Sequence, residues 1–225
     1  MNKKKIFIAV DTNNISKARK IINDTQTNKI KVGYKFGLEF FYSKDGRKFL
    51  SNLKNQTIFL DLKLNDIPNT LRSAMRSLKN LRVTYLTVHL SSGLNALKAL
   101  KKESKNIKIV GVTTLTSLNE KLLKEIGYNK KVSSLVTHQV KLARKANLDA
   151  IVCSAQEVKS VKKYFKGEII TPGIRFDKKI DDQKRIMSPS SAFKMGADWL
   201  VIGRPITKGN IKKNILNLIN HLKND

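Results

Sequence analysis

Three charged side chains of alternating sign lie within six residues of one another: Asp61, Lys63 and Asp66. They follow Thr57-Ile58-Phe59-Leu60, whose β-branched and aromatic composition is typical of a buried strand. Because side chains alternate faces along a strand, we expect Asp61 and Lys63 to point the same way. Burying charge costs free energy unless the charges are paired or used in chemistry. The spacing therefore indicates either a structural ion pair at a strand end or a site where two carboxylates flank one ammonium.

The elements that must position these groups alternate between apolar strands and amphipathic helices. Eight segments are strand-like: Ile6–Asp11, Ile30–Tyr34, Thr57–Lys63, Tyr85–Leu90, Ile107–Thr113, Ala150–Ser154, Glu168–Thr171 and Trp199–Ile202. Eight are helix-like: Ser16–Asp24, Leu38–Leu53, Asn69–Leu81, Asn95–Lys102, Ser133–Lys145, Glu157–Tyr164, Pro189–Met195 and Ile211–Leu222. This alternation predicts a parallel sheet, and eight units predict an α/β (β/α)8 TIM barrel, a single domain over residues 1–225. An open doubly wound sheet is the alternative, but no Gly-x-Gly-x-x-Gly turn follows the first strand.

Catalytic residues of such a barrel come from the C-terminal ends of its strands. Polar residues recur at these ends or within the strands: Asp11, Lys31 in the second strand, Asp61, Lys63, His89, Thr113 to Thr116, Pro172 to Arg175, Gly203 and Arg204. Each has a structural alternative; His89, for example, is expected to be a hydrogen-bonded core histidine rather than a base. None of the alternatives explains why all these residues share one rim.

Two segments suit a phosphate group. Thr171-Pro172-Gly173-Ile174-Arg175 follows the seventh strand and opens a long polar segment ending near Ser188, which is a candidate lid. Gly203-Arg204-Pro205 follows the eighth strand. Loops seven and eight of a barrel commonly bind phosphate, and arginine supplies a forked, charge-assisted pair.

The charge balance is strongly basic, with a net charge of +28 and a pI near 10.2. Phosphate contacts to nucleic acid would explain it. Lysine, however, outnumbers arginine, aromatic residues make up only 7%, and no nucleic-acid-binding motif is present. We therefore favour a solvated, lysine-rich surface and expect no nucleic-acid partner.

Compartment signals are sparse. The apolar run after Met1 is five residues long and stops at Asp11, which favours a first strand over a signal peptide. No apolar run is long enough to span a bilayer. The single cysteine, Cys153, excludes an internal disulfide and agrees with a reducing cytoplasm. No cysteine–histidine cluster offers a zinc site.

Taken together, the motifs resemble those of the orotidine 5′-phosphate decarboxylase family over nearly the whole chain. The segments that carry the resemblance are Val10-Asp11, Ile30-Lys31-Val32-Gly33, Asp61 to Thr70, Leu115-Thr116-Ser117, Thr171 to Arg175, Asp182-Gln183-Lys184-Arg185 and Gly203-Arg204-Pro205-Ile206. The resemblance implies a homodimeric barrel that converts orotidine 5′-phosphate to uridine 5′-phosphate (UMP), the last step of pyrimidine biosynthesis. It implies neither a metal nor an organic cofactor. Residues 34–47 look like an unusual insertion that could alter the second helix.

The same resemblance implies roles for individual residues. Lys31, Asp61 and Lys63 would act in one site, while Asp66 and Thr70 would reach into the site of the partner subunit. Lys63 would stabilise and protonate the carbanion at C6 of the pyrimidine. The remaining contacts with substrate would come from Asp11 and Lys31 to the ribose, Thr116 to the pyrimidine, and Arg175, Gln183, Gly203 and Arg204 to the phosphate.

Two rival interpretations stay open. A magnesium-dependent sugar-phosphate decarboxylase or aldolase of the same barrel suprafamily shares the Asp-x-Lys-x-x-Asp pattern. Those relatives carry a glutamate ligand before Val-Gly in strand two, where this chain has Lys31. The second rival is a basic nucleic-acid-binding protein that uses the barrel as a scaffold.

Overall fold

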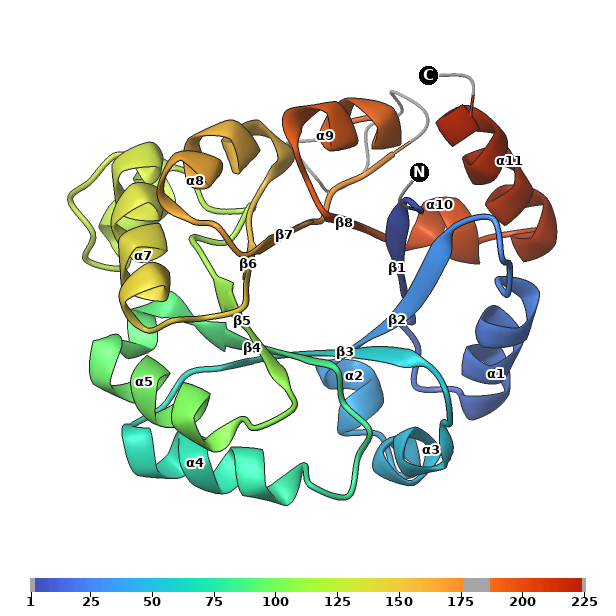
Figure 1. Ribbon diagram of the computed structural model, residues 1–225, viewed down its shortest axis with the longest axis horizontal. Coiled ribbons are helices and arrows are strands. Elements are labelled where there is room, and N and C mark those ends of the chain that lie inside the picture. The colour runs from blue at the N-terminus through green and yellow to red at the C-terminus, as the bar shows by residue number, and fades with distance from the viewer. Residues whose placement is uncertain (1–2, 176–186, 224–225) are drawn as a thin grey trace.

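The computed structural model describes residues 3–175 and 187–223, which form a closed barrel of eight parallel strands with helices outside (Figure 1). The strands run in chain order around the barrel: β1 (Lys5–Ala9), β2 (Lys31–Gly37), β3 (Thr57–Leu64), β4 (Tyr85–His89), β5 (Lys108–Val112), β6 (Ala150–Val152), β7 (Glu168–Thr171) and β8 (Trp199–Ile202). β1 pairs with both β2 and β8, which closes the ring. The predicted TIM barrel is confirmed.

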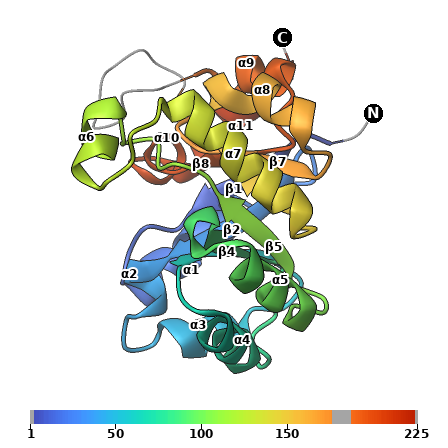
Figure 2. The ribbon, with the colours of Figure 1, turned by 90° about the vertical axis from the view of Figure 1, so that its left-hand side faces the viewer.

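Helices follow the strands and cover the outside of the barrel. The described α-helices are α1 (Ile15–Asp24), α2 (Leu38–Phe41), α3 (Gly46–Asn52), α4 (Pro68–Ser77), α5 (Leu94–Glu103), α6 (Glu120–Glu125), α7 (Val132–Lys145), α8 (Val158–Tyr164), α9 (Pro189–Met195), α10 (Arg204–Thr207) and α11 (Ile211–Lys223). Short 3-10 turns occupy Leu90–Ser92 and Ala155–Glu157. In Figure 2 the short helices α2, α6 and α10 lie toward the left, and the N-terminus lies at the right. No helix in the described part of the chain is long and apolar enough to cross a membrane.

The second βα unit differs from its prediction. β2 continues to Gly37, three residues past the expected end, and the helix expected over 38–53 is split into α2 and α3. A tight turn separates the two helices: a Cβ atom on Gly46 would lie 1.9 Å from the carbonyl oxygen of Phe40. This close approach needs glycine and prevents one continuous helix. The unusual segment over residues 34–47 is thus a longer strand, a short helix and a turn.

The interior of the barrel is filled by aromatic side chains. Phe7 stacks on Trp199 with ring centroids 4.0 Å apart and packs against Phe59 at 4.9 Å. Gly33 on β2 leaves space for the Phe7 ring, because a Cβ atom there would lie 2.7 Å from it. These rings occupy the body of the barrel, so the space for a ligand lies above them, at the C-terminal ends of the strands.

The end of β3 is irregular. Leu60 pairs with Leu86 and Leu64 with Val88, so three residues of β3, Asp61 to Lys63, face a single residue of β4. Lys63 has a φ of 49°, in the left-handed region that non-glycine residues rarely adopt. The bulge therefore lies within the charged motif.

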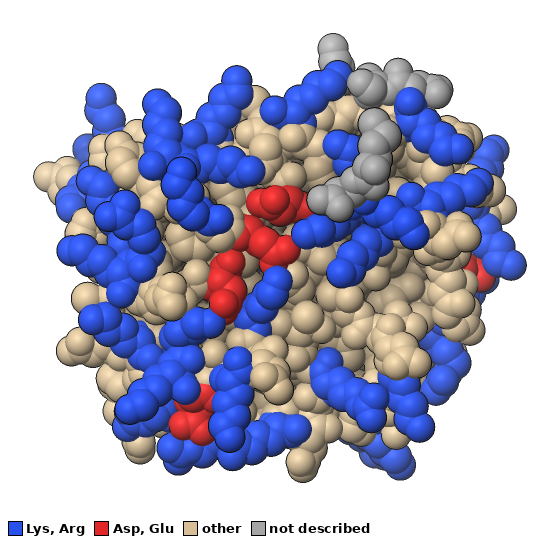
Figure 3. Space-filling model, viewed as in Figure 1, with Lys and Arg blue, Asp and Glu red and all other residues tan. Residues whose placement is uncertain are grey.

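Lysine and arginine side chains are spread over the whole face seen in Figure 3, with a few acidic side chains near its centre. They do not form the single stripe that is typical of a nucleic-acid footprint. The exclusion of a nucleic-acid partner stays a prediction.

Candidate active site

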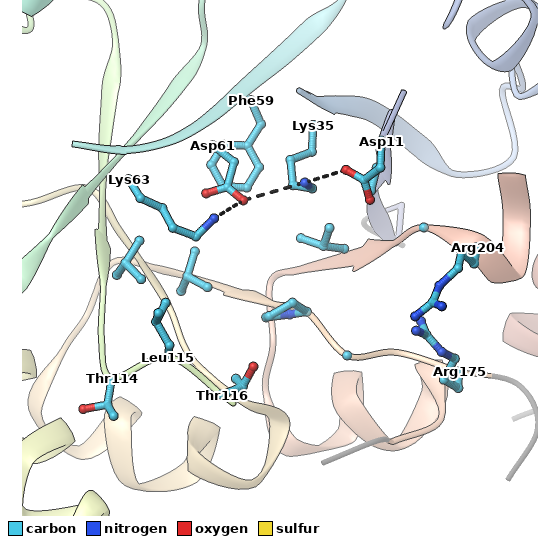
Figure 4. A pocket seen from close by; sticks show the side chains of 17 residues that line it. Asp11, Lys35, Phe59, Asp61, Lys63, Thr114, Leu115, Thr116, Arg175 and Arg204 are labelled. Carbon is cyan, nitrogen blue, oxygen red and sulfur yellow. Dashed lines mark hydrogen bonds and ion pairs between the residues drawn. The ribbon is translucent and has the colours of Figure 1, made fainter. Parts of the chain in front are cut away.

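One cavity of about 510 Å³ lies at the C-terminal ends of the strands (Figure 4). Its lining is Ala9, Asp11, Lys35, Phe59, Asp61, Lys63, Val112, Thr114, Leu115, Thr116, Val152, Pro172, Gly173, Arg175, Val201, Gly203 and Arg204. Apolar side chains from several strands form part of its surface, and charged groups stand at two places around it. Such a lining suits a small ligand that carries both apolar and charged groups.

Four side chains of alternating charge form a row along one side of the cavity. Lys35 Nζ lies 3.1 Å from Asp11 Oδ1 and 3.7 Å from Asp61 Oδ2. Lys63 Nζ lies 2.9 Å from the same Asp61 oxygen. Figure 4 shows the Lys63 ammonium directed at Asp61, and the Lys35 ammonium between Asp61 and Asp11. Asp61 and Lys63 thus share one face as predicted, although they lie within a bulge rather than on a regular strand.

The structure corrects the expectation for Lys31. Lys31 begins β2 and pairs with Lys5, at the N-terminal end of the barrel, and its Nζ lies 5.8 Å from the centroid of the Trp199 ring. It does not line the cavity. The residue of β2 that does so is Lys35, which pairs with Ala9 at the opposite end of the strands.

The sequence pattern does not separate these two lysines, for a physical reason. They are four residues apart, so strand alternation puts both on one face, and only the end point of β2 distinguishes them. The sequence does hold a signal, because Lys35-Phe36-Gly37 repeats the Lys-x-Gly pattern of Lys31-Val32-Gly33 immediately before a helix.

Asp66 and Thr70 lie outside the cavity of their own chain. Both are exposed, and Asp66 Oδ1 accepts a hydrogen bond from the backbone of Ile67 at 2.7 Å. Among the described residues, no cation lies within ion-pair distance of Asp66. Only Asp61 therefore contacts Lys63 as a carboxylate within the described part of one chain.

Two arginines stand on the side of the cavity away from Lys63. Arg175, from the loop after β7, and Arg204, the first residue of α10 after β8, extend toward each other in Figure 4. Gly203 lies beside them, and a Cβ atom there would come within 3.6 Å of Asp11 Oδ2. Thr116 lines the cavity from the loop after β5. Gln183 and most of the candidate lid lie outside the described residues.

His89 ends β4 but does not line the cavity. Burial and the positive charge of Lys63 lower the pKa of its imidazole, against the opposing effect of Asp61. Among the described residues no hydrogen bond involves its ring, so the hydrogen-bonded core histidine that we expected is not what the structure shows.

The charges that line the cavity favour an anionic ligand. The cavity is lined by four cations, from Lys35, Lys63, Arg175 and Arg204, and by two carboxylates, from Asp11 and Asp61. Both carboxylates already contact ammonium groups. Within residues 3–175 and 187–223, no group of three or more histidine, cysteine or acidic side chains could hold a metal ion. The side chain that faces Asp61 from β2 is Lys35, a cation that is unsuited to binding magnesium.

Comparison with known proteins identifies the family of this chain. Residues 4–216 match the model of the Orotidine 5′-phosphate decarboxylase / HUMPS family. The orotidine 5′-phosphate decarboxylase of Wolbachia sp. subsp. Brugia malayi is 42% identical over 95% of this chain and 96% of its own length. That of Carboxydothermus hydrogenoformans is 39% identical over 90% of this chain and 88% of its own. The crystal structure of orotidine 5′-phosphate decarboxylase from Lactobacillus acidophilus superposes with a TM-score of 0.80 at 27% identity, covering 97% of this chain and 99% of that one. The chain therefore belongs to the orotidine 5′-phosphate decarboxylase family.

Proposed function

We propose that this chain decarboxylates orotidine 5′-phosphate to UMP, with Lys63 as the group that stabilises and protonates C6. The observation that carries the proposal is one cavity with a row of ammonium and carboxylate groups on one side and two arginines on the other. The substrate has the matching parts: a pyrimidine carboxylate, a ribose and a phosphate. Relatives about 40% identical over most of the chain carry the same activity in their names.

Decarboxylation leaves an electron pair on C6 of the pyrimidine when the C6–carboxylate bond breaks. A fixed ammonium at that carbon stabilises the developing negative charge, and an Nζ–H proton then moves to C6 to give UMP. Lys63 regains a proton from solvent, so protons and electrons balance without an oxidant or reductant. This step uses only Lys63 and its neighbours, so the proposal includes no cofactor.

Asp61 orients the ammonium. Its side chain is 16% exposed, and its Oδ2 atom lies 2.9 Å from Lys63 Nζ. A nearby carboxylate attracts the ammonium group and restricts the rotamers of the lysine side chain. Lys35 lies between Asp11 and Asp61, so the row of ion pairs continues toward the side of the cavity where Gly203 and Arg204 lie. Lys35 and Asp11 are therefore the proposed ribose contacts, with Lys35 in the role first expected of Lys31.

Arg175 and Arg204 are the proposed phosphate ligands. Guanidinium groups bind phosphate oxygens through paired N–H donors, and these two groups lie on the far side of the cavity from Lys63. Gly203 and Gln183 belong to the same proposal, and Thr116 is proposed to contact the pyrimidine. Binding energy gained at the phosphate, away from C6, can contribute to assembling the site.

The active unit is proposed to be a homodimer with shared sites. Asp66 and Thr70 face solvent in the single chain, and Ile67, next to Asp66, is 66% exposed. Two further large apolar side chains are exposed at α2, Tyr42 by 77% and Leu38 by 46%. Exposed apolar groups of this size, one of them beside the carboxylate of Asp66, suit an interface. In the dimer, Asp66 is the second carboxylate beside the partner's lysine, and Thr70 reaches the same site. A cytoplasmic location completes the proposal, since the only cysteine, Cys153, is buried and free.

The direct test is loss of the ultraviolet absorbance of orotidylate when purified protein is added, with and without a chelator. We expect turnover in both conditions. Turnover that disappears with the chelator and returns with magnesium would instead support the sugar-phosphate type of relative. Absence of turnover in both conditions would overturn the proposal.

A further inference from the structure

Thr87 is the single residue of β4 that faces the three-residue bulge of β3. Its side chain is fully buried, and it does not line the cavity. It nevertheless contacts both ends of the bulge. No role for it follows from the sequence motifs.

The hydroxyl group of Thr87 makes two hydrogen bonds to Asp61 and Lys63, which belong to the row of charged side chains that lines the cavity. Thr87 Oγ1 accepts from the backbone N–H of Lys63 at 2.7 Å and donates to Asp61 Oδ1 at 3.2 Å. The carbonyl oxygen of Leu60 is a more distant, uncharged acceptor at 3.5 Å. Since the hydroxyl has one proton and the carboxylate is both nearer and charged, the bond to Asp61 is favoured.

These bonds restrain the Asp61 carboxylate and the Lys63 backbone at the same time. Asp61 is held at both oxygens, Oδ1 by Thr87 and Oδ2 by the Lys63 ammonium, which fixes the plane of the carboxylate. The Lys63 backbone sits in a left-handed conformation at a place where the strands slip in register. Such a conformation persists only when its surroundings hold it.

We propose that Thr87 is a positioning residue for decarboxylation, which sets the Lys63 backbone and the Asp61 carboxylate so that the ammonium stands at C6. The proposal rests on the proposed function above. Thr87 is not itself a ligand of the substrate. Its effect should therefore fall on the chemical step, because ribose, pyrimidine and phosphate contacts come from other residues.

Thr87→Val keeps the shape of the side chain and removes both hydrogen bonds. We expect kcat to fall about 100-fold, the size of effect seen when a catalytic group is misplaced by about an ångström. We expect the KM for orotidine 5′-phosphate and the affinity for UMP to stay near those of the wild type. Thr87→Ser, which retains the hydroxyl, should recover most of the lost kcat.

Thr25→Val is the matched control. Thr25 is also fully buried, and its hydroxyl lies 2.7 Å from the carbonyl oxygen of Ile21 and 3.1 Å from the Tyr34 hydroxyl, at the end of α1. This variant should lower the unfolding temperature without changing kcat. It separates the general effect of deleting a buried hydroxyl from the specific effect at Thr87.

The outcomes are distinguishable. An unchanged kcat in Thr87→Val, or an equal loss in Thr87→Val and Thr87→Ser, overturns the positioning role. If Thr87→Val does not fold, the pair Thr87→Ser and Thr87→Ala differs by one oxygen atom, and equal kcat values in that pair overturn it too. A wild-type protein without orotidylate decarboxylation overturns the proposed function and this inference with it. With an active wild type, the Thr87 variants test the positioning role alone.

Discussion

Asp61 Oδ2 accepts a hydrogen bond from Lys63 Nζ at 2.9 Å, and the same oxygen lies 3.7 Å from Lys35 Nζ. One carboxylate oxygen is thus shared by two ammonium groups. An ion pair of this kind would be merely structural if it were sealed in the core. Here all three side chains line a cavity, so the pair is presented to a ligand.

Lys63→Ala should retain the fold and lose more than about 1,000-fold in kcat, because one substitution removes both the charge that stabilises the C6 carbanion and the proton donor. Initial rates of orotidylate loss measure the effect. Near-normal turnover would contradict the mechanism. Circular dichroism and UMP binding show whether the variant still folds and holds a nucleotide.

Lys35→Ala and Lys31→Ala form a matched pair on one strand. The first removes the ammonium between Asp11 and Asp61 and should lower kcat/KM about 100-fold, as expected when a positioned charge is lost from a site. The second removes an ammonium at the opposite end of β2 and should leave kcat/KM close to that of the wild type. Steady-state kinetics of both variants decide between the two positions. The reverse order of effects would restore Lys31 to the site.

The barrel could be predicted from the sequence because the eight strand-like runs have strong apolar signals. Asp61 and Lys63 could be placed together because side chains alternate faces along a strand, which puts residues two apart on the same face. The prediction failed at Lys31 because alternation repeats every two residues and says nothing about where a strand ends. The end of β2 is set by its pairing with β1, from Lys5–Lys31 to Ala9–Lys35, which is a long-range contact.

The role of Thr87 could not be predicted from the sequence, for a related reason. Its importance depends on a slip in register between β3 and β4, and such a slip is a property of two strands rather than of one motif. Arg175 and Arg204 were easier to predict, because each lies within four residues of a strand end and shortly after a glycine.

Asp61→Ala and Asp66→Ala should be inactive alone and should complement each other when mixed. If Asp61 serves its own chain and Asp66 the partner's, a mixed dimer holds one site without either substitution. Random exchange of subunits gives about half mixed dimers, so about a quarter of the wild-type activity should return. Activity is measured after the two proteins are mixed under conditions that permit exchange. The control is Asp61→Ala protein alone, taken through the same exchange conditions. No recovery of activity in the mixed sample would contradict the shared site.

Glu168→Gln should lower stability at neutral pH without involving the active site. Glu168 begins β7 at the N-terminal end of the barrel and accepts hydrogen bonds from Lys5, Lys108 and Tyr85 at 3.2, 2.8 and 2.8 Å. Burial raises the pKa of this carboxyl, but the hydrogen bonds from Lys108, Tyr85 and Lys5 outweigh it and bring the pKa to about 2. A depressed pKa favours the ionised form in the folded state. Its contribution is therefore present above pH 4.5 and is lost as the pH falls toward 2.

The expected loss at pH 7 is about 2 kcal/mol, after allowance for solvent screening of the partly exposed lysines. Thermal unfolding of wild type and Glu168→Gln at several pH values measures it, and the two curves should converge as the pH drops below 4.5. Glu103→Gln is the control, because Glu103 pairs with Arg76 at the surface, where an ion pair contributes little. A Glu168→Gln protein as stable as the wild type at pH 7 would show that the lysines at this end of the barrel gain nothing from the carboxylate they surround.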